Sequence, residues 1–388
     1  MKHDWEIKRL DDACEVEYGT RVVQKKDGGK IYPVYGGGGA TFFMDTFNRE
    51  DCLVVARFAM SAQCTRFVEG KFFLNDSGLT VRPKNDKELL PDFLNLQILF
   101  LNDHIYSLSR GTAQRNLDVP AFRNIKIAYP KSLPKQQRIV SILNEAFAAI
   151  AKAKANAEQN LKNAKELFES YLQGVFENGN WETKKLNEIT EVKDGTHDSP
   201  KYIKEGIPFI TQKNIKPNGL SFDDTKFITD TDHEKFYKRS NVAYGDILIS
   251  MIGANRGMAA IVDDKRVFSI KNVGLIKSSD SINMNYLLYF LKSSLAMKYV
   301  LYMSNGGAQE FVGLTALRSF PIPFPTLKEQ QTIVRQLDAL RAETQKLEAV
   351  YQKKIDDLEE LKKSILQKAF AGELTSAGSI TEKNVVAV

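Results

Sequence analysis

The sequence predicts an α+β protein in which two globular α/β segments are separated by two long, antiparallel coiled-coil helices. One observation behind this prediction is a helix-like segment that occurs twice, at 134–177 and at 327–373. The other is a weaker repeat that relates the globular segments 1–133 and 178–326 to each other. The tail at 374–388 loses this periodicity, and we expect it to be a frayed end. Together the repeats predict an internal pseudo-twofold arrangement.

The two long segments share the motifs at both of their ends. KQQRIV at 135–140 returns as EQQTIV at 329–334, and SYLQGVF at 170–176 returns as SILQKAF at 364–370. Between these motifs, apolar or small residues recur at alternating steps of three and four, which is the seam of a coiled coil. The seam positions are Ile139, Leu143, Ala146, Ile150, Ala153 and Ala157 in the first copy, and Ile333, Leu337, Leu340, Thr344, Leu347 and Tyr351 in the second.

Neither long segment contains an internal proline, and as a helix each would be roughly 60 Å long. A single amphipathic helix cannot bury its own apolar stripe. Because a globular segment returns the chain between the two helices, the simplest solution is that they pack on each other in antiparallel fashion. A coiled coil that only joins two copies of the chain is the alternative.

The globular segments repeat less closely than the helices. DCLVVA at 51–56 and DILISM at 246–251 predict buried strands, and a second strand signal follows near Leu79 and Leu275. Other residues also correspond between the segments: Trp5, Leu10, Gly19 and Thr20 match Trp181, Leu186, Gly195 and Thr196.

The later part of each globular segment predicts helices and then a loop and strand that lead into the long helix. Apolar residues recur at three and four in 93–103 and 285–296, which predicts helices. The stretch 110–130 then aligns with 305–325. Prolines stop the last strand and pre-set the start of the long helix. These are Pro130 and Pro134 in the first copy, and Pro321, Pro323 and Pro325 in the second.

Composition permits a polyanionic partner without requiring one. The chain has 388 residues, 43% hydrophobic and 26% charged, with a formal net charge of +6. Cys14, Cys52 and Cys64 lack CxxC spacing, which indicates neither a disulfide framework nor a zinc site. The N-terminus has no apolar signal-peptide core, and no run approaches the length of a membrane-spanning helix. We therefore expect a soluble protein of the cytoplasm.

The sequence contains no recognisable catalytic motif. A phosphate-binding loop would need Ser or Thr after Gly-Lys, but Gly29 and Lys30 are followed by Ile31. HExxH, GxSxG and the Asn-Pro-Pro-Tyr type of methyltransferase motif are absent as well. The glycines at 36–39 could cradle a phosphate, although a plain flexible loop is the simpler interpretation. The histidines are scattered, so we expect no catalytic or metal role from them: His3, His104, His197 and His233.

The order and double occurrence of these motifs resemble the specificity subunit of type I restriction–modification enzymes. The resemblance rests on YPVYGGGG at 32–39, DGTHDSP at 194–200, GDILISMIGANRG at 245–257, the two AQ loops and the PxxxQQxIV helix starts. It implies that each globular segment is a target recognition domain that reads one half of a split site in double-stranded DNA. It also implies that the chain is not itself an enzyme and has no cofactor of its own.

The same resemblance implies partner subunits. The long helices are expected to set the distance between the recognition domains and to dock two methyltransferase subunits, and two restriction subunits are a further possible partner. S-adenosylmethionine, ATP and Mg²⁺ would then be held by those subunits. Because the two globular segments differ in sequence, the expected DNA site is asymmetric and bipartite, with an unread spacer.

Candidate DNA contacts are loop residues of the types that read base edges, namely Arg or Lys for guanine and Asn or Gln for adenine. In the first segment they are Arg57, Gln63, Arg66, Arg110, Gln114, Arg115 and Asn116. In the second they are Thr196, His197, Gln212, Lys213, Asn214, Asn255, Arg256, Asn305 and Gln309. For each of them, solvated surface or loop structure is the alternative. Gln114 and Gln309 occur in both copies, so they are equally suited to stabilising a shared loop.

Candidate partner contacts lie where the apolar stripe of each long helix broadens toward its far end. They are Leu161, Leu167, Phe168, Leu172, Phe176, Leu358, Leu361, Ile365, Leu366 and Phe370. A two-helix seam does not bury so wide a stripe, and we expect helices of the methyltransferase subunits to cover the excess. A coiled-coil scaffold or regulator that binds another protein partner is the alternative function.

Overall fold

The computed structural model of the protein describes residues 4–303 and 312–374. It divides into two compact units. Unit 1 comprises the chain up to Glu158 together with the chain from Gln352 onward, and unit 2 spans Gln159–Tyr351. Each unit therefore contains one globular segment and a part of both long helices.

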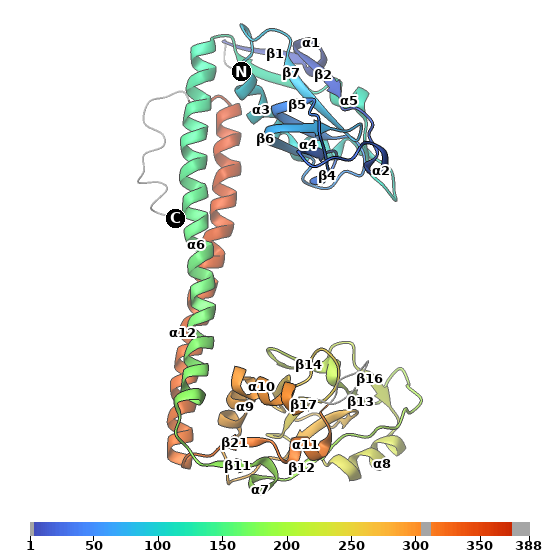
Figure 1. The fold of residues 1–388 in the computed structure, drawn as a ribbon, viewed down its shortest axis with the longest axis vertical. Coiled ribbons are helices and arrows are strands. Elements are labelled where there is room, and N and C mark those ends of the chain that lie inside the picture. The colour runs from blue at the N-terminus through green and yellow to red at the C-terminus, as the bar shows by residue number, and fades with distance from the viewer. Residues whose placement is uncertain (1–3, 304–311, 375–388) are drawn as a thin grey trace. The chain divides into compact units, whose positions relative to one another are not determined.

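The two long helices are continuous elements (Figure 1). Helix α6 spans Leu133–Asn178 with 46 residues, and α12 spans Leu327–Phe370 with 44 residues. Both predicted helices are thereby confirmed. Neither contains a proline after its first turn, so every interior backbone N–H can pair with the carbonyl four residues earlier.

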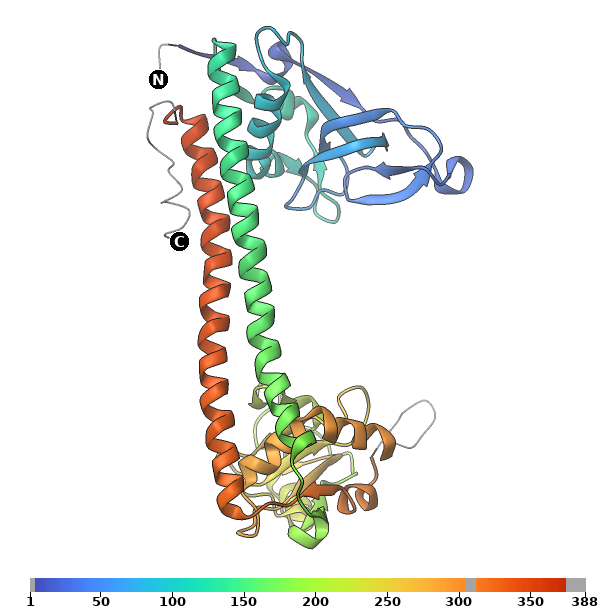
Figure 2. The same cartoon turned by 60° about the vertical axis from the view of Figure 1, so that its left-hand side comes forward.

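Within each unit the helix portions run antiparallel, side by side (Figures 1 and 2). In unit 1, the ammonium group of Lys362 lies 5.1 Å above the Phe147 ring, and Lys154 forms an ion pair with Glu359. Residue numbers thus rise along one helix as they fall along the other. The predicted seam is buried in this unit, because Ile139, Leu143, Ala146 and Ile150 share a core with Leu358 and Ile365.

The globular segment of unit 1 is built on a six-stranded sheet with the order β2-β7-β5-β6-β3-β4. All neighbouring strands are antiparallel except β3 and β6, which are parallel. The strands are β2 (Cys14–Tyr18), β3 (Tyr32–Tyr35), β4 (Ala40–Met44), β5 (Arg49–Ala56), β6 (Thr65–Leu74) and β7 (Gly78–Pro83). The strands predicted near 51–56 and Leu79 are therefore β5 and β7.

Helices and short strands complete unit 1 around this sheet. The antiparallel pair β1–β10 joins the start of the chain to the strand that precedes α6, with Trp5 opposite Pro130. These elements are β1 (Trp5–Arg9), α1 (Leu10–Ala13), α2 (Gln24–Asp27), α3 (Pro91–Phe100), α4 (Asn102–Ser107), β8 (Ser109–Arg110), β9 (Asn116–Leu117), α5 (Val119–Arg123) and β10 (Lys126–Pro130). The helix predicted at 93–103 is in fact two helices, since α3 ends before Leu101 and α4 begins after it.

Unit 2 contains a four-stranded antiparallel sheet with the order β12-β20-β17-β18 and a three-stranded sheet with the order β16-β13-β19. The hairpin β14–β15 stands beside them. The strands are β12 (Val192–Asp194), β13 (Ile207–Ile210), β14 (Ile215–Lys216), β15 (Gly219–Leu220), β16 (Lys226–Ile228), β17 (Ile247–Ser250), β18 (Ala259–Ile261), β19 (Ser269–Ile270) and β20 (Val273–Ile276). The strands predicted at 246–251 and near Leu275 are β17 and β20.

Several of the remaining elements of unit 2 correspond to elements of unit 1. The antiparallel pair β11–β21 precedes α12, with Thr183 opposite Pro323, just as β1–β10 precedes α6. These elements are β11 (Thr183–Lys185), α7 (Leu186–Ile189), the 3₁₀ turn η1 (Gln212–Asn214), α8 (Asp230–Ser240), α9 (Met284–Lys292), α10 (Ser294–Met303), α11 (Leu314–Arg318) and β21 (Pro321–Pro323). The predicted helix 285–296 is divided at Ser293, whose hydroxyl accepts a hydrogen bond from the Ala296 amide (3.2 Å).

The end of each long helix inserts an aromatic ring into a globular segment. In unit 1 the Phe370 ring of α12 lies 5.5 Å from Phe93 and 5.2 Å from Phe100. In unit 2 the Phe176 ring of α6 lies 5.5 Å from Tyr286 and 5.2 Å from Phe290. Each globular core is therefore continuous with the long helices.

Candidate nucleic-acid interface

Two loops that carry predicted contacts of the first segment meet the glycine-rich loop 36–39 at one end of the sheet. The Leu117 amide donates to the carbonyl of Arg57 (2.8 Å), and the Met60 amide donates to that of Arg115 (2.9 Å). These bonds join the loop after β5 to the β8–β9 hairpin. The glycine-rich loop 36–39 joins the same cluster, because the Gly37 amide donates to the Ser77 hydroxyl (3.2 Å) while the Arg57 amide donates to the Ser77 carbonyl (2.8 Å).

Three of the predicted contacts in this cluster are engaged in building the loops. The guanidinium group of Arg57 lies 4.8 Å from the Tyr18 ring centroid and 4.5 Å from that of Phe58. Arg66 donates to the carbonyls of the glycine loop at Gly37 (3.0 Å) and Gly38. The Asn116 side-chain oxygen accepts a hydrogen bond from the Ala59 amide (3.3 Å). For these residues, loop structure accounts for the side-chain position.

The other four predicted contacts of the first segment are exposed. Gln63 and Gln114 sit on the loops described above. Arg115 lies 5.1 Å from the Tyr106 ring, which holds its guanidinium group in the hairpin. The side chain of Arg110 is 82% exposed although it forms an ion pair with Asp118. These side chains form a polar surface that can offer both guanidinium and amide groups to a ligand.

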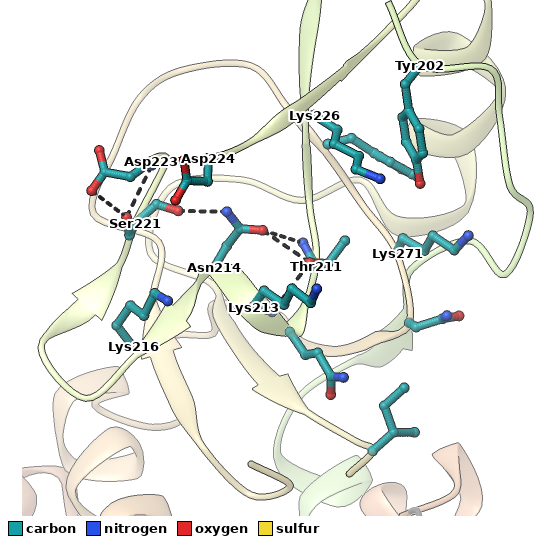
Figure 3. A pocket seen from close by; sticks show the side chains of 14 residues that line it. Tyr202, Thr211, Lys213, Asn214, Lys216, Ser221, Asp223, Asp224, Lys226 and Lys271 are labelled. Carbon is teal, nitrogen blue, oxygen red and sulfur yellow. Dashed lines mark hydrogen bonds between the residues drawn. The ribbon is translucent and has the colours of Figure 1, made fainter. Parts of the chain in front are cut away.

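Unit 2 has a cavity of about 700 Å³ where η1, the β14–β15 hairpin and the loop after β19 come together (Figure 3). Four lysines and two aspartates line it. The surplus of lysine gives the cavity a positive potential, and this favours an anionic ligand. These charged residues are Lys213, Lys216, Lys226, Lys271, Asp223 and Asp224.

Asn214, a predicted contact, belongs to the wall of this cavity and is fully hydrogen-bonded there. Its side-chain oxygen accepts from the Thr211 amide (3.0 Å), and its amide nitrogen donates to the Ser221 carbonyl (3.1 Å) and the Thr225 hydroxyl (3.2 Å). It therefore stabilises the loop. Its neighbours Gln212 and Lys213 also line the cavity.

His197 is connected to the same cavity through a charged network. Its Nδ1 atom lies 2.7 Å from Oδ1 of the cavity-lining Asn272, and its Nε2 atom lies 3.0 Å from Oδ2 of Asp194. Asp194 is buried and accepts hydrogen bonds from Nη2 of Arg239 at 2.7 and 2.9 Å. Because the buried carboxylate is paired, it can hold the exposed imidazole ring in place. Thr196 is itself buried, and its hydroxyl accepts from the Asp198 amide (3.1 Å).

Asn255 and Arg256 lie on the loop between β17 and β18, which turns through Gly253 and Gly257 with φ angles of 72° and 86°. The Arg256 guanidinium group donates to the Gly253 carbonyl (3.3 Å). Next to this turn, Ile252 lines the cavity. The two remaining predicted contacts, Asn305 and Gln309, lie outside the described residues.

Several residues at this site were missed by the sequence reasoning. Lys216, Lys226 and Lys271 come from separate elements, and an isolated lysine in a loop carries no signal that distinguishes it from a solvated surface residue. Asn272 has a φ angle of 53°, a conformation in which asparagine is enriched, but only the structure reveals that angle. Arg239, on α8, is linked to the site through Asp194, a connection that sequence neighbours do not reveal.

No group of three or more His, Cys, Asp or Glu side chains suitable for a metal ion occurs within residues 4–303 and 312–374. Burial raises the pKa of the Cys14 thiol to about 12 and that of Cys64 to about 11, so neither is a thiolate near neutral pH. Among the same residues, no helix is both long and apolar enough to cross a membrane.

The predicted partner surface lies largely inside the chain. The apolar stripe is too wide for a two-helix seam, and within each unit the globular segment covers most of it. Leu172, Phe176, Leu358 and Ile365 are buried, and Phe168, Leu361, Leu366 and Phe370 pack against the same cores. Leu161 is partly buried, whereas Leu167 is 50% exposed.

The large apolar side chains of the long helices that are exposed all belong to unit 2, as far as the described residues extend. They are Leu167 and Tyr171 on α6, and Leu327, Leu347 and Val350 on α12. The seam prediction was wrong for Leu347, which is 41% exposed. Exposed apolar groups of this kind are suited to covering by another protein.

Two related globular segments, each packed against parts of both long helices and each carrying polar loops, are typical of an internally duplicated recognition protein. The family model for the type I restriction modification DNA specificity domain matches residues 2–162 and again residues 178–359. The chain belongs to this family. It is a type I restriction–modification specificity subunit, which is a non-catalytic chain.

Individual relatives agree with the family match. The chain is similar to the specificity subunit of the type I restriction enzyme MjaVIII of Methanocaldococcus jannaschii, with 22% identity over 406 residues, covering 96% of this chain and 94% of that protein. It is 29% identical over 175 residues to the EcoBI specificity subunit of Escherichia coli, covering 45% of this chain and 37% of that one.

Solved structures share the fold. The HsdS subunit of Thermoanaerobacter tengcongensis superimposes with a TM-score of 0.56 at 19% identity, covering 96% of this chain and 98% of that one. A chain from a structural study of complex assembly and conformational transition in a type I R-M system gives a TM-score of 0.76 at 18% identity, with coverages of 96% and 99%.

Proposed function

We propose that the chain reads an asymmetric, bipartite DNA site, with each globular segment contacting one half. The observation that carries this proposal is the double family match, since residues 2–162 and 178–359 are each matched by a DNA specificity domain. The two reading surfaces differ in construction, one formed by a glycine-rich loop and a hairpin and the other by a lysine-lined cavity. Different surfaces should read different half-sites.

The side-chain types on the two surfaces support phosphate contacts by some residues and base contacts by others. In the second segment, Lys213, Lys216 and Lys271 are suited to backbone phosphates, which contribute affinity without sequence information. In the first segment, the exposed Arg110 and Gln114 are suited to guanine and adenine edges, respectively. We propose that Arg57, Arg66 and Asn214 stabilise the loops that form these surfaces and do not contact bases themselves.

We further propose that α6 and α12 set the distance between the two half-sites and dock two methyltransferase subunits. The uninterrupted helices support the first part, because a continuous helix has a fixed rise of about 1.5 Å per residue. The exposed Leu347 and Val350 support the second part. S-adenosylmethionine, ATP and Mg²⁺ would be held by the partner subunits, with restriction subunits as additional partners, and the complex would act on DNA in the cytoplasm.

Base-resolution mapping of methylated bases in the host genome tests this function. Deleting the gene should remove one methylated motif that consists of two unlike half-sites separated by an unread spacer. If every methylated motif survived the deletion, the chain would not direct methylation, and the coiled-coil scaffold would become the better account.

A further inference from the structure

The first glutamine of the repeated QQ motif is buried in both copies, and the second is exposed. Gln136 and Gln330 are each 0% exposed, whereas Gln137 and Gln331 face solvent. Burial of an uncharged amide is unfavourable unless its donors and acceptor are hydrogen-bonded. The partners of these two amides therefore indicate what the buried position is for.

The side-chain oxygen makes an equivalent bond in the two units. In unit 1, Oε1 of Gln136 accepts from the backbone N–H of Leu90 (2.8 Å), the residue at the N-cap position of α3. In unit 2, Oε1 of Gln330 accepts from the backbone N–H of Asn283 (2.8 Å), the residue that caps the start of α9. Helices α3 and α9 are the corresponding helices of the two globular segments.

The side-chain nitrogen donates to backbone carbonyls, and in both units one of these carbonyls belongs to the segment just before the long helix. Nε2 of Gln136 donates to the carbonyl of Pro130 (2.7 Å), at the end of β10, and to that of Glu88 (2.8 Å). Nε2 of Gln330 donates to the carbonyl of Pro325 (2.9 Å), between β21 and α12. A reversed amide would face donor against donor, so the network fixes its orientation. One amide thus ties the first turn of a long helix to the preceding segment and to a helix of the globular segment.

The same globular helix also packs against the second long helix. Phe370 of α12 contacts Phe93 and Phe100 of α3, and Phe176 of α6 contacts Tyr286 and Phe290 of α9. Apolar packing is non-directional. The hydrogen bonds of the glutamine add a directional constraint at one end of the helix.

We propose that Gln136 and Gln330 are positioning residues that fix the orientation of each globular segment on its pair of long helices. Given the proposed DNA-reading function, on which this step rests, they define the single spacer length at which both half-sites are accepted. A displacement of about 3.4 Å between the reading surfaces corresponds to one base pair. The loops that would read DNA do not include either glutamine. Loss of the hydrogen bonds of Gln136 or Gln330, each of which we call a latch, therefore leaves the half-site sequences unchanged.

Matched variants test this role in the intact chain co-expressed with its methyltransferase subunit. Gln136→Met and Gln330→Met keep the length of the side chain but remove its hydrogen bonds, and Gln137→Met changes the exposed neighbour as a control. The substrate is a DNA library that pairs the two half-sites across spacers differing by single base pairs. We expect both latch variants to methylate the neighbouring spacers at least about tenfold more, relative to the preferred one, than the wild type or the control.

Hydrogen exchange of the isolated wild-type chain gives a readout that requires neither DNA nor a variant. The backbone amides of Leu90 and Asn283 should exchange as slowly as core amides. Fast exchange at both would show that the glutamine hydrogen bonds are not kept in solution, and this result would overturn the proposal even if the Met variants were too unstable to assay. If exchange is slow but the variants keep the spacer preference of the wild type, the positioning role is wrong. Failure of the proposed function is recognised separately, because the wild-type complex would then methylate no member of the library.

Discussion

Replacing Phe176 by alanine removes the aromatic anchor at the end of α6. The ring is 3% exposed and lies 5.5 Å from that of Tyr286 and 5.2 Å from that of Phe290. Truncating a buried phenylalanine to alanine costs about 3–5 kcal/mol of unfolding free energy. We therefore expect the free energy of unfolding of unit 2 to fall by roughly 4 kcal/mol.

Thermal unfolding of the isolated chain, followed by circular dichroism, measures this loss. For a domain of this size about 1 kcal/mol shifts Tm by about 2–4 °C, so the transition of unit 2 should move down by roughly 8–16 °C. Leu167→Ala is the matched control, because Leu167 lies on the same helix but is 50% exposed, and it should shift Tm by no more than about 2 °C. An unchanged Tm in Phe176→Ala would refute the intrachain packing and restore Phe176 as a contact for another subunit.

Three further perturbations test other parts of the account. In salt titrations of DNA binding by the isolated chain, the double variant Lys213→Ala and Lys271→Ala should reduce the slope of log binding constant against log salt by about 2. It should weaken DNA binding without changing the half-sites. The control variant Lys152→Ala and Lys363→Ala, at exposed positions of the long helices, should leave the slope unchanged. Lys8 and the Tyr129 hydroxyl hold the pKa of the Glu88 carboxyl below its usual range, so its contribution to stability is present above the unfolded pKa and is lost as pH falls through the folded value. Glu88→Gln should therefore flatten the acid side of a Tm-against-pH profile, and an unaltered profile would contradict the pairing. Inserting four helix-forming residues after Ala155 lengthens α6 by about 6 Å and should lengthen the unread spacer by one or two base pairs, with an unchanged spacer at full activity arguing against a spacing role for the helices.

The long helices could be predicted from the sequence because their signal extends over many turns. Apolar residues at steps of three and four mark α6 and α12, and the same end motifs occur in both. What covers the apolar stripe could not be predicted. The positions of Phe176 and Phe370 within the apolar pattern of their own helices indicate that this face of each helix is buried. A globular segment of the same chain and a helix of another chain would, however, leave the same pattern in the sequence.

Similar local sequences in the two globular segments have different roles. Asp246 precedes β17 and is buried, with its carboxylate 2.6 Å from Lys277. Asp51 precedes a similar apolar run but is exposed, at an irregular point of β5 where its φ angle is 44°. The partner that makes burial of Asp246 tolerable comes from the end of β20, so sequence neighbours alone could not identify it.

The candidate contacts show the same limit. Arg57 and Arg66 have the residue type that reads guanine, but their guanidinium groups are engaged by two aromatic rings and by the carbonyls of the glycine loop. His197, the one histidine among the candidate DNA contacts, lies beside the cavity of unit 2. The QQ motif was recognised as a pattern, but Gln136 and Gln137 differ only in which face of the helix they occupy, and tertiary packing decides that.

A domain exchange followed by base-resolution methylation mapping tests whether each globular segment reads its own half-site. Residues 15–125 are replaced by the corresponding segment of a relative, and the hybrid is co-expressed with the same methyltransferase subunit. If the two segments read DNA independently, one half of the methylated motif changes while the other half and the spacer stay as they were. A change in both halves would contradict independent reading, because the two segments would then have to read DNA jointly.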